Sequence, residues 1–216
     1  DVTQVDRIPV DSPAVRALDD DRLSPHLAIR VNGVRIAVKG GNWGMSDWRK
    51  RVSRERLEPY FRLQRDAHMN VVRNWVGQST EPAFYELADE YGMLVFSDFW
   101  ASTQNFQLEP QDEALFLRNA ADVIRRYRHH PSIVLWFGRN EGVPHPLLNE
   151  GLEQLVAELD GGRLYMGSSN DVNLATSGPY NYREPAEYFT TLAQGFSVEV
   201  GTPSFSTLES FRAWIP

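Results

Sequence analysis

The chain has 216 residues, of which 42% are hydrophobic and 12% aromatic, enough to fill the core of one large domain or two small ones. Its net charge of -7 argues against a nucleic-acid partner, because phosphate recognition needs clustered lysine and arginine side chains. The sequence has no cysteine and no apolar run of the roughly 18 residues that a membrane-spanning helix needs, which excludes disulfides, thiolate metal sites and a membrane span.

The first forty residues predict little regular structure apart from one hairpin. Residues 1–26 are polar and follow neither the helical nor the strand period, which predicts an irregular lead-in. The β-rich runs Leu27–Val31 and Val34–Val38 flank Asn32-Gly33, a dipeptide that favours a type I′ turn, and therefore predict a hairpin. The second run leads into Gly40-Gly41-Asn42-Trp43, so we expect Asn42 and Trp43 to follow a strand.

Beyond this hairpin, amphipathic helices and short apolar runs alternate along the chain. Thr80 is a plausible N-cap for the second helix, and Gly92 is a plausible end for it. Helices are expected at 54–68, 80–91, 112–128 and 147–159, and strands at 71–75, 93–96, 133–137, 163–166 and 195–198, with an ambiguous strand at 177–180.

Nearly continuous apolar strands that are each followed by a helix are typical of a covered parallel sheet. None of the predicted strands is followed by a glycine-rich phosphate loop, which removes the commonest reason to prefer an open nucleotide-binding sheet. The sequence therefore predicts an α/β fold, a (β/α)8 TIM-type barrel, of which about seven strands can be counted.

Side chains suited to binding sugars lie at the ends of most predicted strands. In a (β/α) barrel the carboxyl ends of the strands meet at one mouth, where catalytic residues lie. Indole rings can pack on the C–H faces of a sugar while carboxylates and amides bind its hydroxyls. Taken singly, each tryptophan or charged residue also fits a core or ion-pair role. The candidates for substrate binding are Trp43, Arg73, Asn74, Trp75, Asp98, Trp100 and Asn140, and Asn42, Ser168, Ser169 and Asn170 lie at further strand ends.

Two glutamates, Glu141 and Glu199, end separate predicted strands about three strand–helix steps apart. Cleavage of a glycoside with retention needs two carboxyl groups about 5–5.5 Å apart, one to protonate the leaving oxygen and one to attack the anomeric carbon. We therefore expect Glu141 to be the acid/base and Glu199 to be the nucleophile.

Two other chemistries fit the sequence poorly. None of the five histidines forms the i, i+4 helical pair of a zinc site, so we expect no metal. Ser168-Ser169 lacks the G-x-S-x-G turn of a serine hydrolase.

The run from Tyr127 to Gly142 resembles the acid/base signature of family-2 glycoside hydrolases, in which an R-x-H-P-S-I-x-x-W strand ends in Asn-Glu. Residues 84–95 resemble the family's F-Y-x-L-x-D-E-x-G-L-L-V segment, residues 31–43 resemble the start of its barrel, and Phe196–Gly201 resembles its nucleophile strand. The resemblance covers about residues 27–210. It implies that Glu141 is the acid/base, that Asn140 holds the sugar 2-position, and that Glu199 forms the glycosyl-enzyme.

Three short motifs resemble the β-mannosidase and exo-β-glucosaminidase branch more than the β-galactosidase branch. They are Asn42-Trp43, Asn74-Trp75 and Asp98-Phe99-Trp100. Tyr180 resembles the Gly-Pro-Tyr element of that branch, which implies a place in the pocket. Two positions depart from the pattern. Arg139 stands where β-mannosidases more often have a small or amide residue, and Val198 stands where many members have serine.

Members of this family carry β-sandwich domains before the barrel, so the resemblance implies a fragment of a longer multidomain protein. We expect a lead-in at 1–26 and a catalytic barrel domain at 27–216 that lacks its closing strand and helix and contacts β-sandwich domains of the parent. Because such a barrel has an open edge, we expect the isolated chain to be weakly active or inactive.

The expected function is that of a retaining exo-glycosidase that hydrolyses terminal β-mannosides or β-glucosaminides by double displacement, without a cofactor. The carbohydrate substrate favours a periplasmic or secreted setting, which no targeting segment supports. The alternatives are a non-catalytic carbohydrate-binding barrel, β-galactosidase or β-glucuronidase specificity, and endo-acting cleavage in an open groove.

Overall fold

The described part of the chain is built around a five-stranded parallel sheet. The structure is a computed structural model and describes residues 3–8, 26–44, 49–102, 109–169, 184–187, 196–199, 201 and 206–215. The sheet has the strand order β4-β5-β6-β7-β8, and every neighbouring pair is parallel. Its strands are β4 (Gly40–Trp43), β5 (Val71–Asn74), β6 (Leu94–Asp98), β7 (Ile133–Arg139) and β8 (Leu164–Ser168).

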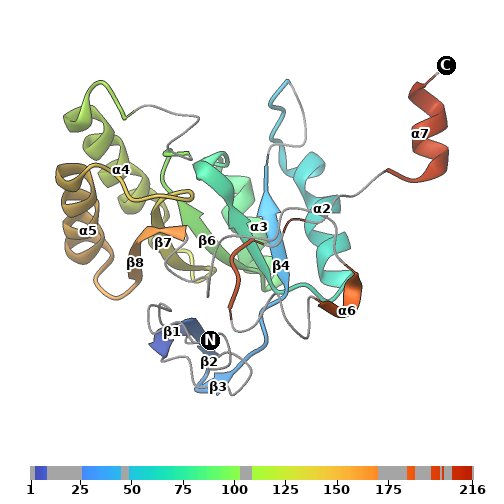
Figure 1. Ribbon diagram of the computed structural model, residues 1–216, viewed down its shortest axis with the longest axis horizontal. Coiled ribbons are helices and arrows are strands. Elements are labelled where there is room, and N and C mark those ends of the chain that lie inside the picture. The colour runs from blue at the N-terminus through green and yellow to red at the C-terminus, as the bar shows by residue number, and fades with distance from the viewer. Residues whose placement is uncertain are drawn as a thin grey trace.

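Helices connect these strands and lie along one side of the sheet (Figure 1). They are α2 (Arg54–Asp66), α3 (Pro82–Tyr91), α4 (Glu113–Tyr127) and α5 (Pro146–Asp160), and the short helix η1 (Trp75–Gly77) follows β5. The alternation of strands and helices is the one predicted for a (β/α) barrel. Two further helices, α6 (Pro185–Glu187) and α7 (Leu208–Trp214), lie toward the C-terminus.

The helix ends follow local capping chemistry. Asp112 is the N-cap of α4, where its Oδ1 accepts a hydrogen bond from the backbone N–H of Leu115 at 2.8 Å. Gly92 ends α3 in the left-handed conformation at φ 66°, as predicted. The predicted N-cap Thr80 is wrong by one residue, because Pro82 takes the first helical position and leaves Glu81 as the N-cap.

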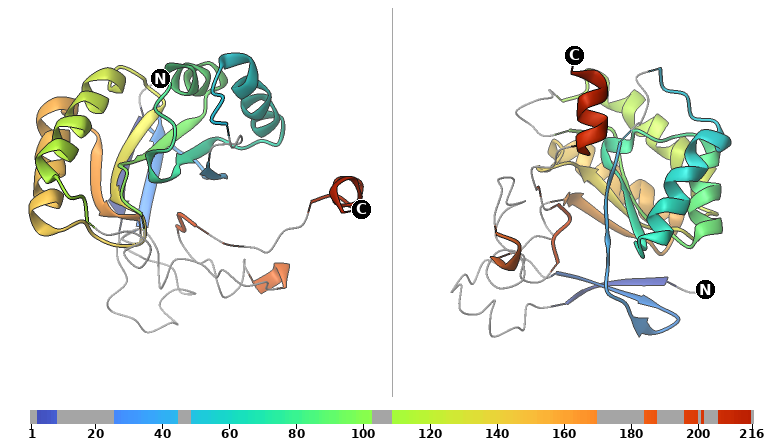
Figure 2. Two further views of the ribbon diagram at one scale, coloured as in Figure 1. Left: turned by 90° about the horizontal axis from the view of Figure 1, so that it is seen from above. Right: turned by 90° about the vertical axis from the view of Figure 1, so that its right-hand side faces the viewer.

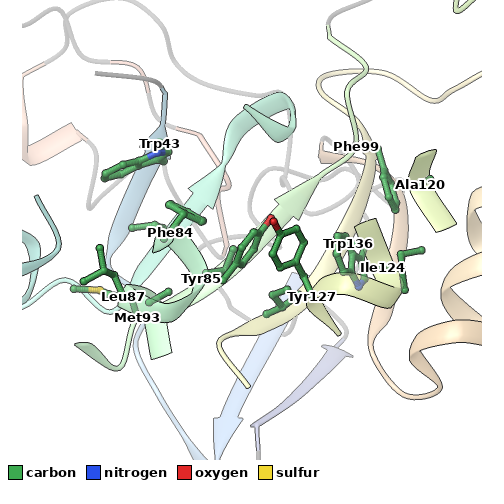
Figure 3. Packing of buried hydrophobic residues seen from close by; sticks show 14 of the residues in the cluster. Trp43, Phe84, Tyr85, Leu87, Met93, Phe99, Ala120, Ile124, Tyr127 and Trp136 are labelled. Atoms are coloured by element: carbon green, nitrogen blue, oxygen red, sulfur yellow. The ribbon is translucent and has the colours of Figure 1, made fainter. Parts of the chain in front are cut away.

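The main core lies between the sheet and the helices and is rich in aromatic rings (Figure 3). Trp43 of β4 packs against Phe61 and Phe84 with ring centroids 5.3 Å away in both cases. Tyr85 of α3 stacks on Tyr127 of α4 at 4.2 Å. These contacts join α2, α3 and α4 to the outer face of the sheet.

A second core fills the inner face of the sheet. Phe96 and Phe137, from neighbouring strands, meet edge to face at 6.2 Å, and Phe196 packs on Phe96 at 6.1 Å. Because side chains alternate along a strand, Val95 faces the helices while Phe96 faces this interior. The segment that ends in Glu199 is thus packed against the barrel interior.

A small antiparallel sheet covers one end of this interior (Figure 2). It has the order β1-β2-β3, with β1 (Thr3–Ile8), β2 (His26–Val31) and β3 (Val34–Arg35). The predicted hairpin is confirmed: β2 pairs with β3, and Asn32 and Gly33 have φ angles of 51° and 80°, as a type I′ turn requires.

Three strand predictions need correction. The expectation of an irregular stretch at 1–26 is wrong for Thr3–Ile8, which is ordered by pairing with β2, a partner that local periodicity cannot reveal. The first barrel strand is Gly40–Trp43 itself, so Asn42 and Trp43 lie within it. The expected strand at 195–198 is not found at Phe196–Glu199, since none of the described strands pairs with these residues. The ambiguous strand at 177–180 falls outside the described residues.

Among the described residues, no helix combines the length and the apolar character that crossing a membrane requires.

Candidate active site

A buried arginine is at the centre of the polar side chains at the carboxyl ends of the strands. Arg73, near the end of β5, is 2% exposed. Its Nε donates to Oδ1 of Asp98 at 3.0 Å and its Nη2 donates to Oδ2 at 2.6 Å, so the two side chains form a bidentate ion pair. The backbone N–H of Val76 donates a further hydrogen bond to Oδ2 of Asp98 at 3.0 Å. The arginine and the carboxylate are therefore fixed in one geometry.

The same guanidinium binds residues from two other parts of the chain. Nη1 of Arg73 donates to Oε1 of Glu199 at 2.6 Å, and Nη2 donates to Oδ1 of Asn140 at 2.8 Å. Nδ2 of Asn42 donates to Oε1 of Glu199 at 2.8 Å. The structure thus brings together Arg73, Asp98, Asn140 and Glu199 of the predicted site, together with Asn42.

Burial and charge act in opposite directions on this cluster. Burial alone disfavours the charged form of Arg73, but the neighbouring charges of Asp98 and Glu199 outweigh it and raise the pKa of Arg73 above its ordinary value. Burial raises the pKa of Asp98, against the opposing effect of Arg73. Arg73 therefore stays positively charged between the two carboxylates.

Glu141, two residues after the end of β7, has an unusual backbone conformation. Its φ angle is 50°, in the left-handed region that residues other than glycine seldom adopt. Its N–H donates to Oγ of Ser169 at 3.0 Å, and the N–H of Asn140 donates to the carbonyl of Ala101 at 2.9 Å. Contacts to the ends of both neighbouring strands therefore hold the backbone at Glu141.

The predicted site dipeptides separate because adjacent strand residues face opposite sides of the sheet. Asn42 is in register with Arg73, and both join the cluster. Trp43 is in register with Asn74, and both side chains face the helices. Nε1 of Trp43 donates to Oγ of Ser79 at 2.9 Å, and Asn74 exchanges hydrogen bonds with the backbone of Ser79 at 2.8 and 2.9 Å.

Two further predicted tryptophans, Trp75 and Trp100, lie in the segments that follow β5 and β6. Trp75 begins η1, and Trp100 packs edge to face on Phe116 of α4 at 5.5 Å. A Cβ at position 77 would lie 3.0 Å from the ring of Trp100. The glycine therefore lets this ring pack closely against the backbone of η1. Tyr180 and Asn170 fall outside the described residues.

Two contributors were not recognised as such from the sequence. Ser169 was noted only as a strand-end residue, and its hydroxyl accepts the hydrogen bond from Glu141. Val76 contributes a backbone N–H to Asp98 from a left-handed conformation at φ 46°. A neighbouring glycine, Gly77, is the one local signal of that turn. Within the part of the chain that the structure covers, no group of three or more His, Asp or Glu side chains is placed to hold a metal ion.

The chain is similar in sequence to proteins that are named as mannosidases. It is 32% identical to the mannosylglycoprotein endo-beta-mannosidase of Lilium longiflorum, in an alignment that covers 87% of this chain and 24% of that protein. It is 37% identical to the beta-mannosidase of Mus musculus, over 55% of this chain and 14% of that protein. The chain therefore spans a quarter or less of the length of these relatives.

Solved structures share the fold. The beta-D-mannosidase of Dictyoglomus thermophilum superposes with a TM-score of 0.71 and 26% identity, over 99% of this chain and 29% of that one. The exo-chitosanase CsxA of Amycolatopsis orientalis, also named an exo-beta-D-glucosaminidase, superposes with a TM-score of 0.75 over 98% of this chain and 26% of that one. At 19% identity, this second match shows the fold alone.

The family model described as "Glycosyl hydrolases family 2, TIM barrel domain" matches residues 26–177. This match confirms the predicted TIM-type barrel, and the β-mannosidase relatives agree with the branch expected from the sequence. Because the match covers more than half of the chain, this chain belongs to family 2 of the glycosyl hydrolases, and residues 26–177 are part of its TIM barrel domain.

Proposed function

We propose that the full-length protein is a retaining exo-glycosidase that hydrolyses terminal β-linked sugars of the β-mannoside or β-glucosaminide class. One observation carries the proposal. Arg73 binds Glu199 through Nη1 and Asn140 through Nη2, and Glu141 is the next residue after Asn140. One buried side chain therefore binds both Glu199 and the residue that precedes Glu141, at the mouth of the barrel.

Glu199 is suited to act as the nucleophile. Its Oε1 accepts hydrogen bonds from Arg73 and Asn42, so two donors hold this carboxyl group. In the first step, this carboxylate attacks the anomeric carbon and forms a covalent ester while the bond to the leaving oxygen breaks. Arg73 and Asn42 hold the carboxylate in one orientation, so that little of its motion has to be frozen when the substrate binds.

Glu141 is suited to transfer the proton. As an acid it protonates the leaving oxygen in the first step, and as a base it takes a proton from the water that attacks the ester in the second step. Water thereby restores the Glu199 carboxylate and releases the sugar with its original configuration.

Covalent labelling of the full-length protein tests the nucleophile. A 2-fluoro glycoside should label the wild-type protein at Glu199, because the fluorine slows hydrolysis of the ester. The Glu199→Gln variant should take up no label, as detected by intact-protein mass spectrometry. Glu209→Gln changes an exposed glutamate on α7 and should label normally. Labelling of Glu199→Gln would show that another residue attacks the sugar.

Leaving-group dependence tests the acid. Glu141→Ala should lower kcat/KM by about 100-fold or more for phenyl glycosides, whose leaving oxygen needs a proton, and far less for 2,4-dinitrophenyl glycosides. Equal losses for both substrates would contradict the acid role of Glu141.

A second candidate is endo-acting cleavage, which the name of the Lilium longiflorum relative favours. A panel of p-nitrophenyl β-glycosides, compared with mannose-containing oligosaccharides, separates the two candidates. Rapid turnover of p-nitrophenyl β-mannoside or β-glucosaminide supports exo action. Turnover of internal linkages alone supports endo action. Fastest turnover of the galactoside or glucuronide moves the specificity to those branches, and binding without turnover supports a non-catalytic barrel.

A further inference from the structure

Arg139, the last residue of β7, has no part in the reaction as proposed so far. Its side chain is 1% exposed. Its Nε donates to the carbonyl of Ser102 at 2.7 Å, and its Nη1 forms an ion pair with Glu109 at 2.5 Å. Ser102 and Glu109 both belong to the connection between β6 and α4. Arg139 therefore holds this connection against the end of β7, just before Asn140 and Glu141.

A backbone hydrogen bond extends the same attachment. The N–H of Asn140 donates to the carbonyl of Ala101 at 2.9 Å, next to the Ser102 carbonyl that Arg139 binds. The side chain of Arg139 and the backbone of Asn140 thus bind consecutive carbonyls of one segment. This arrangement fixes the end of β7 just before Glu141.

The backbone at Glu141 needs such support. A non-glycine residue in the left-handed region is strained and persists only where its surroundings hold it in place. The bond from Glu141 to Ser169 holds one side, toward β8. Arg139 and Asn140 hold the other side, toward β6.

Arginine is suited to this place in a way that lysine is not. The guanidinium directs Nε toward Ser102 and Nη1 toward Glu109 from one rigid plane, whereas a lysine ammonium is a single point charge. Glu109 also needs a positive charge beside it, because its Oε2 is buried and has no hydrogen-bond partner within the described residues. These contacts therefore require an arginine at position 139 and a carboxylate at position 109.

We propose that Arg139 is a positioning residue for Glu141: through Ser102 and Glu109 it fixes the end of β7 so that the Glu141 carboxyl reaches the leaving oxygen. This inference rests on the proposed function. It assigns to Arg139 a far larger effect on proton transfer by Glu141 than on the attack by Glu199.

The test compares two substrates in the full-length protein. The sugar is the one that the wild type hydrolyses fastest, supplied as the phenyl and as the 2,4-dinitrophenyl β-glycoside. The measured quantity is kcat/KM, which includes the first bond cleavage and excludes the later hydrolysis of the ester. Arg139→Met keeps the aliphatic bulk of the side chain and removes the donors.

Arg139→Met should lower kcat/KM for the phenyl glycoside by about 10- to 100-fold, the size of effect that misplacing a catalytic group produces. For the dinitrophenyl glycoside the loss should stay below about threefold, since that leaving group needs no acid. Arg139→Lys should show the same selective loss. Glu109→Gln should show a smaller one, and combining it with Arg139→Met should add nothing, because both changes remove the same contact.

Arg163→Met is a matched control at the opposite end of β7. Arg163 also binds backbone carbonyls, those of Arg128 at 2.8 Å and His130 at 2.7 Å, and it pairs with Asp160. Its loss should lower thermal stability and affect the two substrates equally.

The positioning role would be overturned if Arg139→Met and Arg139→Lys lowered kcat/KM equally for both substrates. It would also be overturned if neither variant lowered kcat/KM for the phenyl glycoside. Additive losses in the double variant would do the same. If Arg139→Met does not fold, as judged by circular dichroism, Arg139→Lys and Glu109→Gln decide by the same criterion. A wild-type protein that cleaves neither substrate overturns the proposed function and this inference with it, whereas an active wild type with unselective variants overturns the inference alone.

Discussion

Arg73 is a buried cation whose stability depends on its partners. Its side chain and that of Asp98 are 2% and 0% exposed, and Glu199 supplies a second carboxylate. Moving such charges out of water is costly, and their mutual attraction offsets the cost only when every partner is in place. Removing one member therefore has a larger effect than removing an exposed pair.

Arg73→Met should lower the free energy of unfolding by about 3–5 kcal/mol, because Asp98 is left as an unpaired buried charge. Urea unfolding, followed by tryptophan fluorescence, measures the loss. Adding Asp98→Asn should recover part of it, since the uncompensated charge is removed. Arg65→Met breaks the exposed pair with Asp66, at 54% and 52% exposure, and should lower the free energy of unfolding far less. Comparable losses for both arginines would contradict this account.

The sequence identifies these residues by strand end, but it does not identify which side each one faces. Arg73 and Asn74 both end the same apolar run, and only Arg73 reaches the cluster. The choice depends on the register of β5 against β4, which places Asn42 beside Arg73 and Trp43 beside Asn74. Register is a property of paired strands, so a single strand examined alone cannot supply it.

At the scale of elements, helices were easier to predict than strand pairing. The predicted helix at 54–68 differs from α2 by two residues at its end, and that at 112–128 differs from α4 by one residue at each end. Their amphipathic pattern and caps are local signals. The strand Thr3–Ile8 has no such signal, because it is stabilised by β2, which lies some twenty residues later in the chain.

The contact between α3 and α4 predicts a sensitivity to alkaline pH. Tyr85 of α3 stacks on Tyr127 of α4, and burial raises the pKa of Tyr85 from 10.0 to about 12, although Ser97 and Asn74 oppose the shift. The unfolded chain releases the phenolic proton near pH 10 while the folded chain keeps it until about pH 12. The stabilisation is therefore complete below about pH 10 and is lost as the pH rises to about 12.

The expected loss from Tyr85 across that interval is about 2–3 kcal/mol in the free energy of unfolding. Urea unfolding at several pH values between about 9 and 12 measures it. Tyr85→Phe keeps the stacked ring and removes the proton, so its stability should fall less steeply over the same interval. Identical slopes for the two proteins would rule out Tyr85 as the source.

At the scale of the whole molecule, the described strands supply five of the eight that a closed TIM barrel contains. An open sheet leaves strand edges unpaired and part of the mouth without a wall. The cluster around Arg73 is nevertheless present in the chain, so geometry and turnover can be separated by experiment.

The isolated 216-residue chain should hydrolyse aryl β-glycosides on the order of 100-fold more slowly than the full-length protein, because the substrate is held on fewer sides. Initial rates with p-nitrophenyl β-mannoside and β-glucosaminide, at matched concentrations, measure the difference. Circular dichroism of the isolated chain should show the helices α2 to α5, so that slow turnover is not attributed to an unfolded sample. Rates within tenfold of the full-length protein would contradict the expectation.

The bidentate pair between Arg73 and Asp98 also has a consequence during protein synthesis. Asp98 follows Arg73 by 25 residues, whereas Glu199 follows Arg73 by 126. Ribosomes add about 5–20 residues per second, so the segment with Glu199 emerges roughly 5–20 s after Asp98. Because Asp98 alone satisfies two donors of the guanidinium, a nascent chain can pack β5 against β6 without enclosing an unpaired cation. The carboxylate of Glu199 then docks last, onto a cation that is already in place.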